Sequence, residues 1–110
     1  MSLADIAQAQ FEAYNAQDLD AHCACFTEDV VMGGLNGASN AEGAAAYRAV
    51  YEGVFAKFPS NKAELLHRIE IGSTVIDHER VDRGNGEPTF EVAAIYTFRG
   101  DKIARVDFVR

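Results

Sequence analysis

Three turn signals in the second half of the chain constrain its fold more than any other feature of the sequence. Gly72-Ser73, Asn85-Gly86 and Gly100-Asp101 each fit a two-residue hairpin loop, and Asn-Gly is the strongest short signal of this kind. Residues 75–81, between two of these turns, carry β-branched residues at both ends. The second half therefore predicts four strands joined by tight turns into an antiparallel meander.

The first half predicts three helices. Ser2 with Asp5 three residues later indicates a cap for the first helix, and Asp18 can cap a second, short one. The pattern Ser-x-x-Glu at residues 39–42 is interpreted as a capping box that opens the third helix. Pro59 is expected just past the end of that helix, because proline cannot continue it.

The order of these elements predicts the fold class. Residues 28–32 form a turn into a short strand, and the Gly and Asn content of residues 33–40 predicts a loop. Helices first and a meander second indicate an α+β fold, with one sheet and the helices on one side of it. The length of 110 residues predicts a single domain, residues 1–110.

The composition argues against several classes of partner. A net charge of −7 disfavours nucleic acid, whose phosphates require Lys and Arg, and it disfavours an anionic membrane surface. No signal peptide or membrane-length apolar run is found, so we expect a cytoplasmic protein, which suits free thiols at Cys23 and Cys25. His22 beside these cysteines fits no zinc spacing, so we expect no metal and no cofactor.

The turns also predict which residues are neighbours in the sheet. If each loop contains two residues, residue 68 lies opposite 77, 77 opposite 94, and 94 opposite 107. A one-residue bulge in any hairpin would invert every later assignment. The register places Arg68–Asp77–Ala94–Asp107, Glu70–Val75–Tyr96–Arg105 and Leu66–Glu79–Val92–Val109 on one face, and Ile69–Ile76–Ile95–Val106 and His67–His78–Ala93–Phe108 on the other.

Hydrophobic patterning alone places the isoleucine-rich face against the helices. The face that carries Arg68, Asp77 and Asp107 would then lie in solvent. Its charges would form an exposed ladder of ion pairs that contributes little to stability.

The chain contains, in this order, the stretches FEAYNAQDLDAHCACFTEDVVM, GAAAYRAVYEGVFAKFP, RIEIGSTVIDHERV and AAIYTFRGDKIARVDFVR. Together they resemble the nuclear transport factor 2-like superfamily over nearly the whole chain, and within it the small SnoaL-like and ketosteroid isomerase-like proteins. The resemblance implies three helices on a strongly curved, mostly antiparallel sheet, forming a cone-shaped α+β barrel with an apolar pocket. It also implies a homodimer through the convex sheet face, which would bury the isoleucine row and direct the charged row into the pocket.

Few of the catalytic residues of the isomerases and cyclases that this sequence resembles are present at its matching positions. Gly34 stands where the isomerases place a base carboxylate, and Gln10 and Ala94 stand where they place oxyanion donors. Only a supporting Tyr on the third helix matches, as Tyr51. The His that the SnoaL-type cyclases keep at the position of Ala94 is absent too. We therefore do not expect the usual ketosteroid isomerase mechanism.

Four charged residues are the candidates for acid–base chemistry. Arg68 with Asp77 and Asp107 resembles, in composition, the Arg held between two Asp in limonene epoxide hydrolase-like enzymes, where one acid can be a base while the other holds a proton. Glu79 lies over two apolar residues in the predicted register, which makes it the best single general acid or base. The alternatives are a structural Arg68–Asp77 ion pair and a solvated Glu79 at the rim.

Aromatic residues are the candidates for contact with a small hydrophobic ligand. Tyr14, Tyr51 and Tyr96 can hydrogen-bond a carbonyl and Phe26 and Phe98 can line the pocket, whereas in the alternative all of them simply pack. The expected function is proton transfer, isomerisation or hydration on a small apolar molecule that contains oxygen. The alternative is a non-catalytic dimeric module that binds a ligand or only assembles.

Overall fold

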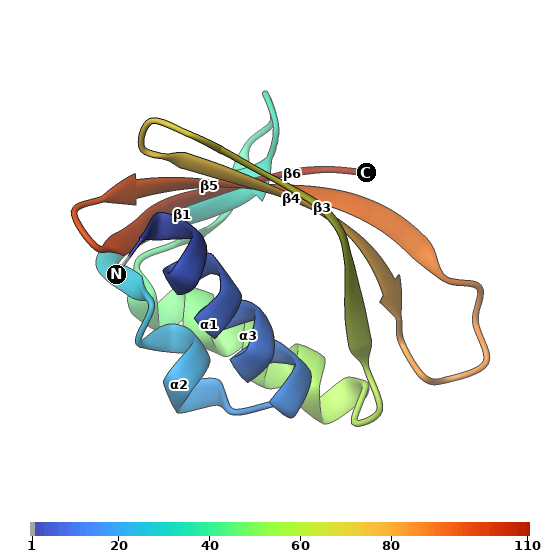
Figure 1. Cartoon of the computed structure of the whole chain (residues 1–110). Helices are drawn as coiled ribbons and strands as arrows, with labels where there is room; N and C mark the ends of the chain where they lie inside the picture. Colours follow the sequence, from blue (N-terminus) through green and yellow to red (C-terminus); the bar gives the residue numbers. More distant parts are fainter. Residues whose placement is uncertain (1) are drawn as a thin grey trace.

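The computed structural model describes residues 2–110 and contains three helices and one six-stranded sheet (Figure 1). The predicted α+β arrangement, helices first and a meander second, is confirmed. In chain order the elements are α1 (Leu3–Ala16), α2 (Leu19–Cys23), β1 (Phe26–Gly34), β2 (Ser39–Glu42), α3 (Ala44–Lys57), β3 (Lys62–Ile71), β4 (Thr74–Asp82), β5 (Phe90–Arg99) and β6 (Lys102–Val109).

The sheet curls over the helices without closing into a complete barrel. Its strand order is β2-β1-β6-β5-β4-β3; the β1–β6 pair is parallel and the other neighbouring pairs are antiparallel. All three helices lie against its concave face, as Figure 1 shows. Within residues 2–110, none of these helices has the length and apolar content that crossing a membrane requires.

Local side-chain signals define the first two helices as predicted. The Asp5 backbone N–H donates to Ser2 Oγ at 3.1 Å, and the Ser2 backbone N–H donates to Asp5 Oδ2 at 3.1 Å. Asp18 Oδ1 accepts a hydrogen bond from the backbone N–H of Ala21 at 3.1 Å. Each bond satisfies a backbone donor that has no partner inside its helix.

The predicted start of the third helix is wrong. Residues 39–42 form β2, and α3 begins at Ala44 after Gly43, whose φ is 93°. Ser39 Oγ does donate to the Glu42 carboxylate, at 2.6 Å, but β1 supplies backbone partners for this segment. The loop predicted over residues 33–40 is shorter for the same reason. Pairing with β1 satisfies more backbone groups than a cap can.

Two of the three hairpins have the predicted loops. Two residues each, 72–73 and 100–101, join β3 to β4 and β5 to β6. The middle loop is longer, spanning residues 83–89, yet Asp77 pairs with Ala94 as predicted. Arg68 pairs with Asp77, also as predicted.

A bulge in β6 makes the predicted position of Asp107 wrong. Phe98 pairs with Ile103 but Thr97 pairs with Arg105, so Ala104 is an extra residue. Every later pairing is shifted by one, which turns Asp107 to the convex face beside Ile95. The predicted rows that ended in Val106, Phe108 and Val109 are inverted too, and Val106 and Phe108 lie on the concave side. A second bulge, at Leu66 in β3, places Leu65 opposite Glu79.

The hydrophobic core lies between the helices and the concave face. Val75, Tyr96 and Phe98 project from the sheet into it, and Asp77 and Glu79 share their face. Patterning alone therefore assigned the wrong face to the interior. The buried face includes the carboxylates, and the isoleucine-rich face is the convex one.

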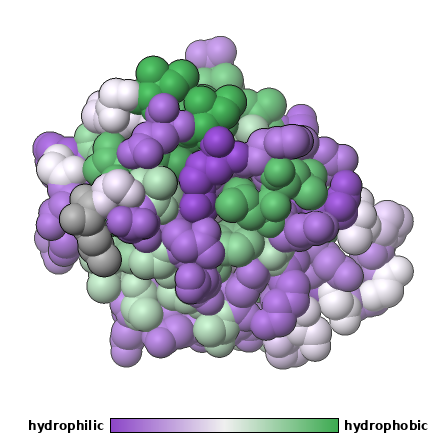
Figure 2. Space-filling view, viewed as in Figure 1, coloured by the Kyte–Doolittle hydropathy of each residue, from purple (hydrophilic) through white to green (hydrophobic). Residues whose placement is uncertain are grey.

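In the part of the chain that the structure describes, no helix covers the convex face, which retains exposed apolar side chains. Ile69 is 50% exposed and Ile71 is 66% exposed, while Ile76 and Ile95 are half-buried. Figure 2 shows apolar surface gathered over the tip of the β3–β4 hairpin, at the upper left of the view. Large exposed side chains of this kind are typical of surfaces that contact another molecule.

Candidate functional site

A cavity of about 420 Å³ lies between the concave face of the sheet and the helices. Four of the candidate residues from the sequence line it: Tyr14, Tyr51, Tyr96 and Glu79. Phe26 and Phe98 do not line it; both are buried in the core. The apolar part of the lining includes Phe11, Met32, Val50, Val54, Val81, Phe90, Val92 and Phe108.

Glu79 is a buried acid without a partner. It lies on β4 between Leu65 and Val92 of the neighbouring strands and is only 8% exposed. No residue in the described part of the chain hydrogen-bonds or ion-pairs with its carboxyl group. The pKa of Glu79 is raised to about 7, first by burial and then by the charge of Asp77, while the charge of Arg68 opposes both effects. Near neutral pH the group can therefore both give and accept a proton.

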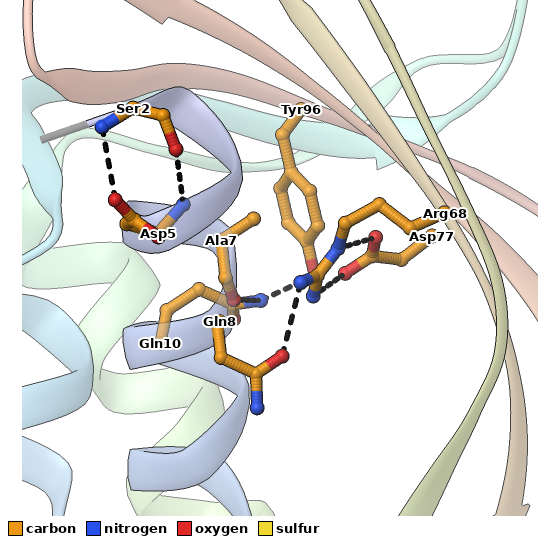
Figure 3. A network of polar contacts seen from close by, with 8 residues as sticks. All are labelled: Ser2, Asp5, Ala7, Gln8, Gln10, Arg68, Asp77 and Tyr96. Atoms are coloured by element: carbon orange, nitrogen blue, oxygen red, sulfur yellow. Dashed lines mark hydrogen bonds and ion pairs between the residues drawn. The ribbon is translucent and has the colours of Figure 1, made fainter.

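The partly buried Arg68 and the fully buried Asp77 form an ion pair that joins the sheet to a helix. Arg68 Nε donates to Asp77 Oδ1 at 2.7 Å and Nη2 donates to Oδ2 at 2.9 Å, while the Asp77 side chain is 0% exposed. Arg68 Nη1 donates to Gln8 Oε1 of α1 at 3.0 Å (Figure 3). Both carboxylate oxygens of Asp77 and all three side-chain nitrogens of Arg68 take part in this contact. This geometry is that of the structural ion pair, the alternative that the sequence left open.

Asp107 does not reach this ion pair. It accepts hydrogen bonds from Arg105 Nε at 3.1 and 3.0 Å on the convex face. The predicted set of one Arg between two Asp is therefore not assembled in this fold.

The Tyr96 hydroxyl is directed from the sheet toward α1, where it meets Gln10 (Figure 3). Gln10 Nε2 donates to Tyr96 Oη at 3.1 Å and to the carbonyl oxygen of Ala7 at 2.9 Å. Burial raises the pKa of Tyr96 well above its usual value, and the negative charge of Glu79 adds to this. Tyr96 thus keeps its proton, and because it accepts from Gln10, its own O–H can be donated to a ligand.

Tyr14 and Tyr51 lie on the helical side of the cavity. Tyr14 Oη accepts a hydrogen bond from Asn61 Nδ2 at 2.7 Å, and Tyr51 Oη lies 3.7 Å from Met32 Sδ, its weak acceptor. Burial raises the pKa of both tyrosines, and the charge of Glu79 contributes to both shifts. A negative charge on Glu79 therefore makes all three tyrosine hydroxyls harder to ionise.

His22 is a lining residue that the sequence did not identify. It is 2% exposed, with Nδ1 3.0 Å from the carbonyl oxygen of Gln10 and Nε2 2.8 Å from Tyr47 Oη. Burial lowers the pKa of His22 to about 4, against the effect of the Gln10 carbonyl. The neutral ring donates from Nδ1 and accepts from Tyr47 at Nε2. Because α2 has only five residues, its periodicity could not indicate this inward position.

The side chains near His22 do not form a metal centre. Cys23 and Cys25 are free thiols that are half-buried and pack against the hydrophobic core. Across residues 2–110, no three His, Cys, Asp or Glu side chains are grouped to hold a metal ion.

Known structures share this fold. An uncharacterized cystatin fold protein from Novosphingobium aromaticivorans is 37% identical, with a TM-score of 0.93, and the match covers 100% of this chain and 99% of that one. A candidate polyketide cyclase from Sinorhizobium meliloti is 23% identical, with a TM-score of 0.83 and coverage of 96% and 94%. A candidate ketosteroid isomerase from Kribbella flavida is 14% identical, with a TM-score of 0.82 and coverage of 96% and 75%.

The sequence comparison is consistent with these structures. No curated protein matches the chain. The SnoaL-like domain matches residues 7–106, which include every helix and strand at least in part. This chain therefore belongs to the SnoaL-like domain family.

Proposed function

We propose that the cavity binds a small apolar molecule containing oxygen and that Glu79 transfers a proton on it. The observation that carries this proposal is the Glu79 carboxyl group, buried on the cavity wall without a partner and with a pKa raised to about 7. An acid that only stabilises a fold is normally paired, as Asp77 is. Strongly shifted acids in cavities are typical of catalytic sites.

The proposed step is removal of a proton from the carbon beside a carbonyl group. The Glu79 carboxylate takes the proton, and the carbonyl oxygen gains negative charge. The Tyr96 hydroxyl, held by Gln10, donates a hydrogen bond to that oxygen. Protonated Glu79 exchanges its proton with water and then protonates the same carbon, which gives hydrogen exchange, or it delivers the proton to a conjugated carbon, which isomerises the molecule. The fold shared with a candidate cyclase and a candidate isomerase supports this reaction class.

Deuterium exchange tests the proposal without knowledge of the natural substrate. The protein should accelerate exchange at the carbon beside the carbonyl of 2-tetralone in D2O, followed by NMR. Glu79→Gln should lower the rate by about 10²-fold or more, because general base catalysis contributes on that scale. Glu64→Gln, at an exposed strand position, is the matched control and should keep the parent rate. Binding of 2-tetralone without any exchange would favour the non-catalytic module instead.

A homodimer through the convex face is a second proposal, supported by the exposed apolar side chains of that face. Ile95→Glu should convert dimers into monomers, since the new carboxylate would be buried at the interface. Size-exclusion chromatography with light scattering measures the result. Ala49→Glu places the same charge on an exposed part of α3 and should leave the dimer intact. A monomeric parent, or a dimeric Ile95→Glu variant, would contradict this interface.

A further inference from the structure

Two arginines without a carboxylate partner line the same cavity. Five of the seven arginines form ion pairs with Asp or Glu. Over the part of the chain that the structure describes, the two that do not are Arg83 and Arg110, and both are lining residues. Carboxylates are abundant, with 17 Asp and Glu against 10 Lys and Arg. A shortage of carboxylates therefore does not explain why these two arginines have no Asp or Glu partner; their position at the cavity does.

Both guanidinium groups are held against one aromatic ring. Arg83 Cζ lies 5.1 Å from the ring centroid of Phe90 and 4.7 Å from that of Phe58, and Arg110 Cζ lies 3.9 Å from Phe90. Arg83 Nη1 also donates to Asn61 Oδ1 at 3.0 Å, and Asn61 is only 1% exposed. A buried amide and two rings thus hold Arg83 beside Tyr14. Its guanidinium has five N–H donors, more than Asn61 and the Tyr14 hydroxyl use, so donors remain for another acceptor.

The two arginines are more exposed than the proton-transfer residues of the same cavity. Glu79 and Tyr96 are buried, whereas Arg83 and Phe90 are half-exposed and Arg110 is exposed. The cavity therefore has a closed end that carries the acid and a more open end that carries two positive charges. Like charges beside one ring repel each other, and an anion between them would relieve that repulsion.

We propose that the ligand carries a carboxylate, which Arg83 and Arg110 bind at the open end while the apolar body extends toward Glu79 and Tyr96. A guanidinium binds a carboxylate through two parallel hydrogen bonds, which fixes orientation as well as adding affinity. A volume of about 420 Å³ lies within the range of small-molecule sites. This inference rests on the proposed function for the site and narrows its ligand class to apolar monocarboxylic acids that contain a further oxygen.

Matched acid and amide probes test the carboxylate site. 4-Phenylbutyrate and 4-phenylbutyramide have nearly the same shape and differ in charge. In calorimetric titrations of the full chain, the acid should bind at least about tenfold more tightly than the amide, because a charge-assisted bidentate contact is worth more than 1.4 kcal/mol. Arg83→Met should remove this preference by weakening the binding of the acid much more than that of the amide, whose carbonyl oxygen can accept only a neutral hydrogen bond.

Arg80→Met is the control for the loss of one positive charge. Arg80 pairs with Glu64 at 3.0 Å and does not line the cavity, so this variant should keep the preference for the acid. Arg83→Lys and Arg110→Met disturb the packing around Asn61 less than Arg83→Met does, and each should reduce the preference at least threefold. An unchanged preference in both of these variants would overturn the proposal, whether or not Arg83→Met folds.

The proposal of a carboxylate site and the proposal of proton transfer by Glu79 can be disproved independently of each other. Equal affinity of the parent for the acid and the amide would overturn the carboxylate site and leave the exchange reaction of Glu79 standing. A clear preference for the acid together with no exchange of 2-tetralone would support the carboxylate site and contradict proton transfer. If neither probe bound at 10 mM and no exchange occurred, both proposals would be wrong.

Discussion

Replacing Arg68 with Met should lower the free energy of unfolding by about 3–5 kcal/mol at pH 7, the usual cost of removing one partner from a buried ion pair. The Asp77 side chain is 0% exposed and receives two hydrogen bonds from Arg68. The variant would leave that carboxylate in the core without a counter-charge, and it would also remove the contact with Gln8 of α1. Urea denaturation followed by circular dichroism measures the loss.

The pH dependence and two further variants identify the cause of this loss. The difference between parent and Arg68→Met should shrink toward pH 4, because a carboxylate that has taken up a proton no longer needs a counter-charge. Arg80→Met breaks an exposed pair and should cost no more than about 1 kcal/mol. Adding Asp77→Leu to Arg68→Met should recover most of the lost stability. Identical denaturation curves for parent and Arg68→Met at pH 7 would mean that this face lies in solvent.

Replacing Glu79 with Gln should raise the free energy of unfolding by about 3 kcal/mol at pH 8, because the folded parent must ionise a buried carboxyl group at this pH and the Gln variant need not. The pKa of Glu79 rises from 4.5 to about 7 because of burial first and the charge of Asp77 second. Between these values the folded state binds the proton more tightly than the unfolded state. The parent therefore loses stability as the pH rises from about 4.5 to 7, and the Gln variant does not.

Thermal and urea unfolding of parent and variant at pH 4, 6 and 8 measure this effect. The two should match at pH 4, diverge at pH 6 and differ fully at pH 8. Glu64→Gln, at an exposed position, should follow the parent at every pH. Curves that stay parallel across the whole range would contradict a buried, unpaired Glu79. If Glu79 is retained for catalysis at a cost in stability, its replacement by Gln should both stabilise the fold and abolish deuterium exchange.

The sequence by itself determined the local structure. The caps at Ser2 and Asp18 and the two-residue loops 72–73 and 100–101 form as predicted. Gly72 and Gly100 have φ values of 57° and 65°, which glycine adopts without strain. The register across β3, β4 and β5 around Asp77 also follows from the turns, although the middle loop is longer than predicted. These features depend on residues that are close in sequence, so they can be predicted from the sequence of this chain alone.

Tertiary contacts decided the rest of the candidate site. The bulge at Ala104 depends on how β6 fits between two neighbouring strands, and it removed Asp107 from the cavity. Both faces of the sheet carry apolar residues, so patterning could not show which one meets the helices. The concave face can be buried because Arg68 neutralises Asp77, whereas Glu79 is left unpaired beside the cavity. Arg83 reaches the same cavity only through the conformation of the loop that follows β4. Pairings between distant segments set these positions, and their free energies are not encoded in any short stretch of the chain.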